Sequence, residues 1–246
     1  MTKMKPRRKS SRQETTGSTN GGPNWTIIGS IIGVSAIALI ALAIVGTLNP
    51  TVAAPPTPVL GETVTNATLY CDENPENCVV VGNPEADVTM IEVVDYGCPH
   101  CASFNRDKAP TLLGDYVETD QVRWMIMPFA LGDITKPSAA AVLCVNEQDP
   151  ELALKFHERI FLLQQSGSEH TLNGFLSAAS FIDGIDSDAL EACVEDERQM
   201  ANVSFNQQAA RALGVSSTPA FFLNDRIISG NQDLAVFTER IDAELN

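Results

Sequence analysis

One stretch constrains this chain more than any other: an apolar, β-branched run that leads directly into two cysteines. The run begins at Val88 and ends in the sequence Cys98-Pro99-His100-Cys101. Such a run predicts a buried strand. Pro99 predicts a helix that starts directly after Cys98, because proline at the first helical position leaves no donor unsatisfied. A strand followed by Cys-X-X-Cys at the start of a helix is typical of thiol redox chemistry.

The predicted helix gives the two cysteines unequal surroundings. Cys98 would lie at the helix N-terminus, where free N–H groups and the positive end of the helix dipole favour its thiolate. Cys101 would lie one turn further along the same face, near enough to form a disulfide with Cys98. We expect the imidazolium of His100 to lower the pKa of the Cys98 thiol further, the alternative being a solvated residue at the helix start.

Three other interpretations of the Cys-X-X-Cys motif compete with redox chemistry: half of a zinc site, an inert structural disulfide, and chance. Zinc would need two further ligands at a matching spacing. Cys71 and Cys78 are separated by six residues, which is not a usual spacing for a zinc knuckle. The predicted strand and helix around the motif are the context that redox chemistry needs, so we favour a redox-active pair.

A second signal lies far downstream, at Thr218-Pro219. These residues precede a short apolar strand at 220–223 and a polar turn. A thioredoxin fold carries a cis-proline at a similar position, where it faces the Cys-X-X-Cys and leaves neighbouring backbone free to pair with a substrate strand. Alone, Thr-Pro before a strand usually contains a trans-proline, so the prediction for Pro219 depends on both motifs together.

With both motifs present, residues 79–246, about two thirds of the chain, resemble the DsbA-like thiol oxidoreductases. The resemblance is carried by Glu92, Cys98-Pro99-His100-Cys101, residues 139–144, Phe156-His157, Phe161, residues 190–193 and residues 214–222. It implies a thioredoxin-like α/β fold with an all-α insertion, often joined to a membrane anchor.

The resemblance also implies a role for Glu92, as a partly buried acid beneath Cys101 that helps to move the proton of that thiol. The alternative, from the alternation of side chains along a strand, is a carboxylate on the solvent face. Arg123, in the next predicted strand, is a candidate ion-pair partner of Glu92. No role is assigned to Asp95, His157 or His170. We expect both histidines to be core or surface residues.

The chain begins with a basic segment and an apolar segment, which together predict a membrane anchor. Residues 1–24 contain six basic residues and one acidic residue, and predict a disordered cytoplasmic tail. Residues 26–48 are uncharged and would form a helix of about 34 Å, enough to span a bilayer core of about 30 Å. We therefore expect a transmembrane helix at 25–48 with the basic side in the cytoplasm and the rest outside. A cleaved signal peptide is the alternative.

Beyond the anchor, residues 49–70 form a predicted Pro-rich spacer, and residues 71–246 a single α/β domain. Strands are predicted at 79–81, 88–95, 122–128, 219–223 and 226–229, and single helices at 99–116 and 233–245. An all-α insertion is predicted at about 136–213, with helices at 137–146, 150–164, 172–182, 188–195 and 196–213. The chain after residue 48 has 30 acidic and 10 basic residues, which excludes nucleic acid as a partner of this part.

All six cysteines follow the apolar segment, which fits an oxidising compartment. With the Cys-X-X-Cys motif as one pair, the other four cysteines allow three connectivities. We choose Cys71–Cys78, which closes a small local loop, and Cys144–Cys193, which would join two helices of the insertion. Free thiols, or exchange with the redox pair, are the alternatives.

The sequence therefore predicts a membrane-anchored, extracytoplasmic thiol:disulfide oxidase, with catalytic residues Cys98, Pro99, His100, Cys101 and Glu92 and substrate-binding residues Thr218 and Pro219. Its substrates would be unfolded exported proteins with free thiols, and the resemblance implies reoxidation by a quinone-linked membrane partner. No metal or organic cofactor is required, and a monomer is expected. One alternative is a reductase or isomerase of the same fold, although isomerases of this kind usually need a dimer cleft and no dimerisation domain is visible. The other alternative is a Cu(I)-binding module, although no Met cluster lies near the pair.

Overall fold

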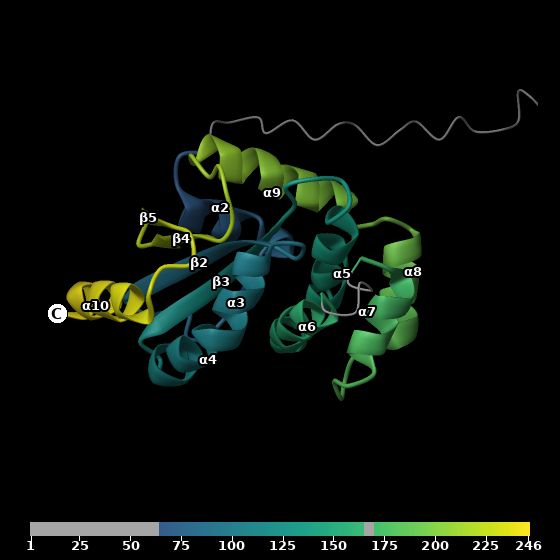
Figure 1. Ribbon diagram of the computed structural model, residues 1–246, viewed down its shortest axis with the longest axis horizontal. Helices are drawn as coiled ribbons and strands as arrows, with labels where there is room; N and C mark the ends of the chain where they lie inside the picture. The colour runs from purple at the N-terminus through teal and green to yellow at the C-terminus, as the bar shows by residue number, and fades with distance from the viewer. Residues whose placement is uncertain (1–63, 165–169) are drawn as a thin grey trace, which may run out of the picture. The chain divides into compact units, whose positions relative to one another are not determined.

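A central sheet of five strands organises the part of the chain that the structure, a computed structural model, describes: residues 64–164 and 170–246 (Figure 1). The strand order is β1-β3-β2-β4-β5. The strands are β1 (Val79–Val81), β2 (Val88–Asp95), β3 (Val122–Phe129), β4 (Ala220–Leu223) and β5 (Arg226–Ser229). β2 and β3 run parallel, and the other neighbouring pairs run antiparallel. The predicted strands are confirmed, with β3 and β4 each differing by one residue at one end.

The predicted tail, the predicted transmembrane helix and most of the predicted spacer, residues 1–63, lie outside the described residues. Among the residues that the structure describes, no helix is long and apolar enough to span a bilayer. The membrane anchor therefore stays a prediction from the sequence.

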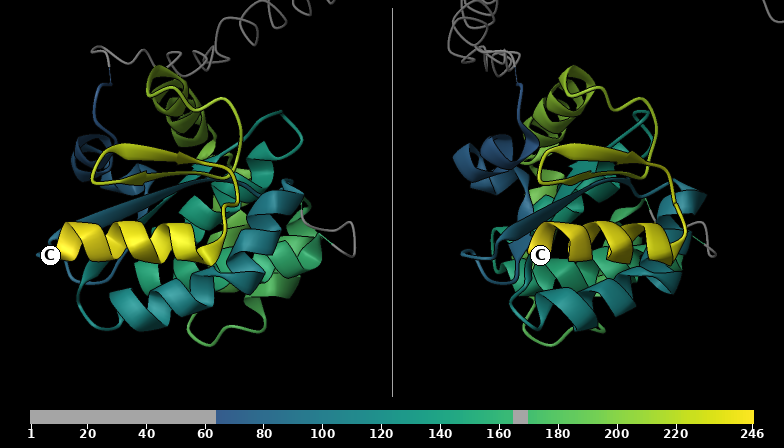
Figure 2. Two further views of the ribbon diagram at one scale, coloured as in Figure 1. Left: turned by 60° about the vertical axis from the view of Figure 1, so that its left-hand side comes forward. Right: turned by 90° about the vertical axis from the view of Figure 1, so that its left-hand side faces the viewer.

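Helices cover both faces of the sheet, which is why β2 is apolar along most of its length rather than at alternate positions. One face packs against α2 (Ala67–Glu73) and α9 (Met200–Ala212), which lie above the sheet in Figure 1. The other face packs against α3 (Pro99–Asp107), α4 (Ala109–Leu112) and α10 (Leu234–Leu245), which lie below the sheet in both views of Figure 2. A polar residue near the middle of β2, such as Glu92, is therefore buried whichever way it points.

The all-α insertion lies between β3 and β4, as predicted. Besides α9 it consists of α5 (Lys136–Asn146), α6 (Pro150–Leu163), α7 (Leu172–Ala179) and α8 (Ser187–Glu195). A disulfide between Cys144 and Cys193 joins α5 to α8, with the two Cα atoms 5.9 Å apart. The four helices of this group lie on one side of the molecule, at the right in Figure 1.

Two helix boundaries in the insertion differ from the prediction by more than one residue. Helix α7 ends at Ala179 rather than at 182, and α9 begins at Met200 rather than at 196. Glu197 has a φ of 52°, in the left-handed region. A continuous right-handed helix cannot include this conformation, so α8 and α9 are separated at Glu197.

The helix predicted at 99–116 is divided, which corrects the sequence prediction. Helix α3 ends at Asp107, α4 begins at Ala109, and η2 (Leu113–Val117) completes the segment. Pro110 has no N–H and cannot donate to the carbonyl one turn earlier, so it interrupts the hydrogen-bond ladder here. Helix α3 is therefore short, and it starts at the cysteine pair.

The boundary of the predicted spacer is also corrected. Proline-rich composition predicts a spacer as far as residue 70, but α2 already begins at Ala67. The Asn66 side chain caps this helix by accepting a hydrogen bond from the Leu69 N–H at 2.6 Å. Cys71 is buried and forms the second disulfide, with Cys78, at a Cα–Cα distance of 5.6 Å. The folded domain therefore begins before residue 71.

Candidate active site

The two cysteines of the motif lie at the start of α3, directly after β2 and its short connecting loop. Cys98 is the N-cap residue of α3, with an extended backbone, and Pro99 is the first residue of the helix. Both thiols are free; Cys98 is partly exposed and Cys101 is fully buried. A thiolate of another protein can therefore reach the sulfur of Cys98 but not that of Cys101.

The surroundings shift the pKa values of the two thiols in opposite directions. The pKa of Cys98 is lowered to about 5, chiefly because the Cys101 thiol donates a hydrogen bond to its sulfur, while burial opposes this shift. The Thr218 side chain and the backbone N–H groups of Cys101 and His100 add to the lowering. The pKa of Cys101 is raised well above its usual value, first by burial and then by the hydrogen bond and charge of Cys98. At neutral pH the pair therefore holds one thiolate, on Cys98.

The second sequence motif lies beside the first. The peptide bond between Thr218 and Pro219 is cis. The carbonyl oxygen of Thr218 is 3.3 Å from Cys98 Sγ, although the two residues are 120 positions apart in the chain. β4, which begins directly after Pro219, pairs with β2, and this pairing brings the two motifs together.

His100 contributes to the site through its backbone. Its side chain is exposed, and no hydrogen bond within residues 64–164 and 170–246 joins the imidazole to Cys98. Its backbone N–H, in contrast, helps to lower the pKa of Cys98. Any residue other than proline supplies such an N–H, so the observed contact does not depend on the histidine side chain.

Asp95, to which the sequence assigned no role, holds the loop that precedes Cys98. Its Oδ1 accepts a hydrogen bond from the Gly97 N–H at 2.7 Å, and its Oδ2 accepts from the Thr135 hydroxyl at 3.0 Å and from the Leu131 N–H. Glycine is needed at position 97, because a Cβ there would lie 2.5 Å from the Thr135 methyl carbon. The sequence signal for this role is an acidic residue that ends an apolar strand shortly before the cysteines.

Glu92, near the middle of β2, is fully buried, because both faces of the sheet are covered. Its Oε1 accepts a hydrogen bond from Asn105 Nδ2 at 2.7 Å. Burial raises the pKa of Glu92 to about 8, and the hydrogen bond from Asn105 and the nearby indole N–H of Trp124 oppose this shift. The charge of Glu92 in turn helps to raise the pKa of Cys101, so the two groups are close enough to influence each other's protonation.

Arg123 is not the ion-pair partner of Glu92, which corrects the sequence expectation. It pairs instead with Asp72, with 2.8 Å between guanidinium and carboxylate. The strand register explains the difference, because Arg123 lies opposite Thr89 while Glu92 lies opposite Ile126. Side chains three positions apart on a strand point to opposite faces, so the guanidinium and the Glu92 carboxyl are on different sides of the sheet.

His157, on α6, is a core residue that lies next to Glu92. Its Nδ1 is 2.9 Å from the Tyr96 hydroxyl, and its Nε2 is 2.6 Å from Asn105 Oδ1 and 4.0 Å from Glu92 Oε2. Burial lowers the pKa of His157 to about 3, so the imidazole is neutral. No local sequence signal indicated that α6 would bring this histidine to β2.

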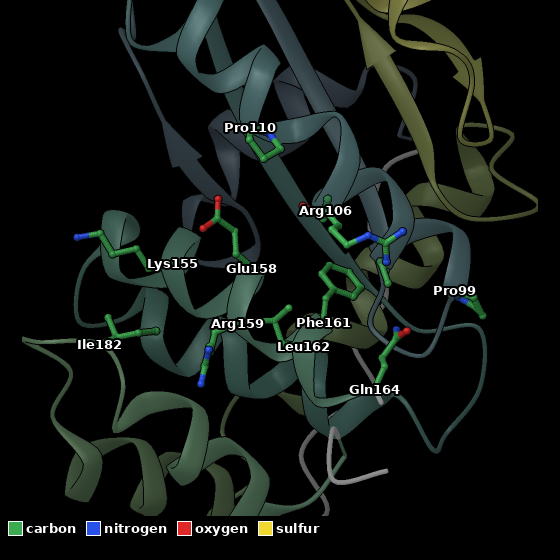
Figure 3. Close-up of a pocket in the computed structure, with 12 residues that line it drawn as sticks. Pro99, Arg106, Pro110, Lys155, Glu158, Arg159, Phe161, Leu162, Gln164 and Ile182 are labelled. Atoms are coloured by element: carbon green, nitrogen blue, oxygen red, sulfur yellow. The ribbon is translucent and has the colours of Figure 1, made fainter. Parts of the chain in front are cut away.

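A groove of about 540 Å³ runs along α3 and α6 beside the cysteine motif (Figure 3). Its lining includes Pro99 at one end and combines apolar side chains such as Leu162 with charged ones such as Arg106. Asn105, the hydrogen-bond partner of Glu92, also lines it. The groove therefore extends from the cysteine motif to the edge of the buried residues around Glu92.

The remaining candidate ligands do not gather into a second site. Within residues 64–164 and 170–246, no three His, Cys, Asp or Glu side chains are grouped as metal ligands. His170 lies away from the cysteines in the sequence and is 2.7 Å from the Ser138 hydroxyl through its Nδ1.

The geometry and the comparison with known families agree on the class of protein. A helix that starts at a Cys-X-X-Cys pair, beside a cis-proline and a buried carboxyl, is an arrangement suited to thiol–disulfide exchange. A family model described as Thioredoxin matches residues 74–243. The chain therefore belongs to this family, and it is a protein thiol:disulfide oxidoreductase.

Relatives place the chain among the DsbA-like members, as the sequence motifs indicated. It is 27% identical over 169 residues to the disulfide bond formation protein D of Bacillus subtilis, covering 68% of this chain and 76% of that protein. A protein-disulfide oxidoreductase relative from Rickettsia conorii is 24% identical over 176 residues, which are 69% of this chain and 61% of that protein.

Solved structures show the same fold. Oxidised BdbD from Bacillus subtilis aligns with a TM-score of 0.63 and 26% identity, over 69% of this chain and 94% of that chain. DsbA from Chlamydia trachomatis aligns with a TM-score of 0.62 over 67% of this chain and 90% of that chain; at 20% identity this match supports the fold alone.

Proposed function

We propose that this protein is a membrane-anchored thiol:disulfide oxidase that introduces disulfides into exported proteins outside the cytoplasm. The observation that carries the proposal is the inequality of the two thiols, with the pKa of Cys98 at about 5 and that of Cys101 raised above its usual value. A stabilised Cys98 thiolate stabilises the reduced pair, and the disulfide is then a stronger oxidant.

The exchange begins with the Cys98–Cys101 disulfide. A client thiolate attacks Cys98 Sγ, the bond between the two enzyme sulfurs breaks, and Cys101 leaves with the electron pair. A second client thiolate then attacks the client sulfur of the mixed disulfide and expels Cys98 as a thiolate. The client gains one disulfide, and the enzyme pair gains two electrons and is reduced.

Glu92 is proposed to supply and remove the proton of Cys101. The leaving Cys101 sulfur is buried, and its raised pKa means that it takes up a proton readily. With a pKa of about 8, Glu92 carries a proton for this step at neutral pH and can accept one when the pair is reoxidised. Thr218 and Pro219 are proposed to hold the client backbone beside Cys98, as the 3.3 Å contact of the Thr218 carbonyl suggests.

The sequence supports the proposed location, and the resemblance to the DsbA-like oxidoreductases supports the proposed partners. The apolar run at 25–48, with a basic segment before it, supports an anchor that leaves residues 49–246 outside. The substrates are then unfolded exported proteins with free thiols, and a quinone-linked membrane protein reoxidises the pair. A reporter that is active only in the cytoplasm, fused to the C-terminus, should be silent; an active reporter would reverse this orientation.

The reduction potential of the Cys98–Cys101 pair tests the oxidase proposal against a reductase. The Cys98 pKa of about 5 is roughly two units below the value of about 7 typical of thioredoxin, and each unit corresponds to about 30 mV. Equilibration of the full chain with glutathione should give a potential at least about 60 mV less negative than the thioredoxin value of about −270 mV. A potential at the thioredoxin value would favour the reductase.

A further inference from the structure

Four buried polar side chains form a chain of hydrogen bonds that ends on Glu92. Tyr96 follows β2, Asn105 lies on α3 and His157 on α6, so three separate segments contribute to it. Glu92 and Tyr96 are fully buried, His157 is 1% exposed and Asn105 is 8% exposed. Burying four polar groups together is costly unless their hydrogen bonds are made, so the arrangement of the donors and acceptors is informative.

The hydrogen bonds of Asn105 set the direction of the whole chain. Its Nδ2 donates to Glu92 Oε1 at 2.7 Å and to the Cys101 carbonyl at 3.2 Å. Its Oδ1 therefore faces His157 Nε2, at 2.6 Å. A carbonyl oxygen can only accept, so the hydrogen of the neutral imidazole is on Nε2. Nδ1 is then the acceptor, and the Tyr96 hydroxyl donates to it at 2.9 Å.

Every hydrogen bond in this chain thus points from Tyr96 towards Glu92. The opposite tautomer of His157 would turn the Asn105 amide around and place its carbonyl oxygen against the Glu92 carboxyl. That contact would repel a carboxylate, whereas the observed N–H stabilises it. Asn105 therefore sets the tautomer that favours an ionised Glu92, and the Tyr96 hydroxyl, which can donate or accept, supports this tautomer by donating to Nδ1.

The chain also leaves one particular atom of Glu92 for proton exchange. Oε1 is occupied by Asn105, and Oε2 has no hydrogen-bond partner among the residues that the structure describes. The titratable groups that face this carboxyl are Cys101, Tyr96 and the neutral His157, and the indole N–H of Trp124 lies nearby without a hydrogen bond to it. None of these groups supplies a positive charge, so hydrogen bonds must support the carboxylate.

We propose that Asn105 and His157 are positioning residues that hold Glu92 ready to exchange a proton with Cys101, with the Tyr96 hydroxyl supporting the direction of their hydrogen bonds. This inference rests on the proposed role of Glu92 as the proton acceptor and donor of Cys101. It adds three residues, from α3, α6 and the end of β2, that touch neither the client nor the reacting sulfur through their side chains.

The test follows the step in which Cys101 attacks the mixed disulfide between Cys98 and glutathione, with the full chain, by rapid quenching between pH 5 and pH 10. This step needs a deprotonated Cys101, so the midpoint of its rate plotted against pH reports the pKa of the group that accepts the proton. Asn105→Leu removes the N–H on Oε1 and should raise the midpoint by at least about one pH unit, which lowers the rate at pH 7 about tenfold.

Substitutions at His157 distinguish positioning from packing. His157→Leu frees the Asn105 amide to turn and should raise the midpoint, whereas His157→Gln keeps an N–H for Asn105 Oδ1 and should restore it. Tyr96→Phe loses only the hydroxyl and should raise the midpoint less than Asn105→Leu does. Phe161→Leu is the matched control, because Phe161 stacks on Tyr96 at 5.1 Å between ring centroids and has no polar atom. Its midpoint should equal that of the wild type.

A wild-type midpoint in Asn105→Leu, or an equal shift in Phe161→Leu, would overturn the inference. If Asn105→Leu does not fold, wild-type midpoints in both His157→Leu and Tyr96→Phe would overturn it instead. Glu92→Gln separates this inference from the function proposed above. If Glu92→Gln leaves the pH profile unchanged, the role of Glu92 itself is wrong; if it removes the midpoint while the other variants keep it, only the positioning role is wrong.

Discussion

The two faces of the sheet each bury a cluster of polar side chains, and the two clusters behave differently. The structural cluster, on the face covered by α2 and α9, consists of Tyr70, Asn77 and Asn206. The acid cluster lies between the opposite face of the sheet and α3. It consists of Glu92, Tyr96, Asn105 and His157. Both are built from amides and a tyrosine, but only the acid cluster contains a carboxyl.

In the structural cluster every group is neutral, and two of the four hydrogen bonds that join it end on backbone carbonyls. Asn206 accepts from the Tyr70 hydroxyl at 2.8 Å and donates to the carbonyls of Asn77 and Pro128 at 2.8 and 2.9 Å. Burial raises the pKa of Tyr70 to about 12, so it stays protonated. These bonds join α2, α9 and β3 in a way that no physiological change of pH alters.

In the acid cluster, by contrast, a buried group titrates near neutral pH. Burial keeps the pKa of Glu92 at about 8. Each cluster also contains one oxygen without a hydrogen-bond partner among the described residues, Oε2 of Glu92 and Oδ1 of Asn77, so titration is what distinguishes them. The comparison teaches that similar side chains can form a network that fixes the fold at any physiological pH, or one around a buried acid that titrates near neutral pH at some cost in stability.

The largest effect that would test this contrast is the pH dependence that Glu92 contributes to the free energy of unfolding. Its pKa is about 8 in the folded protein and about 4.3 in an unfolded chain. Between these values the unfolded state loses a proton that the folded state keeps, so stability falls as the pH rises from about 4 to about 8, by up to about 5 kcal/mol. Glu92→Gln should remove this slope. Urea unfolding at pH 5 and pH 8 measures this slope, with the oxidised chain, in which neither catalytic cysteine titrates. Equal slopes in the wild type and in Glu92→Gln would contradict the raised pKa of Glu92.

A change at Asn206, in the structural cluster, should lower the stability of the protein and leave the chemistry of the cysteines unchanged. Asn206→Leu leaves the Tyr70 hydroxyl and two buried carbonyls without their partner, and should cost about 3 kcal/mol or more, with a fall in Tm of about 10 °C. The pKa of Cys98 and the oxidation rate of the folded protein should be unchanged. Gln208→Leu, which also replaces an amide by leucine but at an exposed position of α9, should change stability by less than about 0.5 kcal/mol. A loss of oxidase rate in folded Asn206→Leu would remove the distinction between the clusters.

The Cys71–Cys78 disulfide belongs to the structural side of the comparison. It spans a sequence separation of 7 residues, and closing so short a loop should contribute about 2.5 kcal/mol through the entropy of the unfolded chain. Replacing both cysteines with alanine should therefore lower Tm, while the reduction potential of the catalytic pair stays the same. A shifted potential, measured against glutathione, would show that this disulfide takes part in exchange.

The smallest effect is expected at His100, in the first turn of α3. His100→Leu keeps the backbone N–H that helps to lower the pKa of Cys98, so this pKa should rise by less than about half a unit. His100→Pro removes the N–H at a position in the first helical turn that tolerates proline, and should raise the pKa further. Thiolate absorbance against pH measures both variants. A rise of a full unit in His100→Leu would assign the effect to the imidazole instead.

Much of the fold could be predicted because its signals are local. The strands, the helical insertion and the start of α3 each follow from a short run of residue types, and the structure reproduces them. The errors are local as well. Pro110 divides the helix after the cysteines, α9 begins only after the left-handed Glu197, and Asn66 caps α2 inside the predicted spacer. Each error depends on the conformation or capping of a single residue, which the pattern around it does not indicate.

The site could be predicted only in part, because its side chains meet across long sequence separations. Alternation along β2 could not tell whether Glu92 is buried, since helices cover both faces of the sheet. Pairing Arg123 with Glu92 required the strand register, which places them on opposite faces. Asn105 and His157 lie 52 positions apart, and no pattern in either helix indicates that they meet.

The sequence by itself determined the chemistry at the cysteines, because a strand that leads into Cys98 and a proline that starts the next helix fix the local geometry of both thiols. Tertiary structure alone decided what surrounds them: the Thr218 carbonyl beside Cys98, and the chain of hydrogen bonds from Tyr96 through His157 and Asn105 to Glu92. The physical reason is that local backbone preferences act over a few residues, whereas the partner of a buried polar group depends on how distant segments pack.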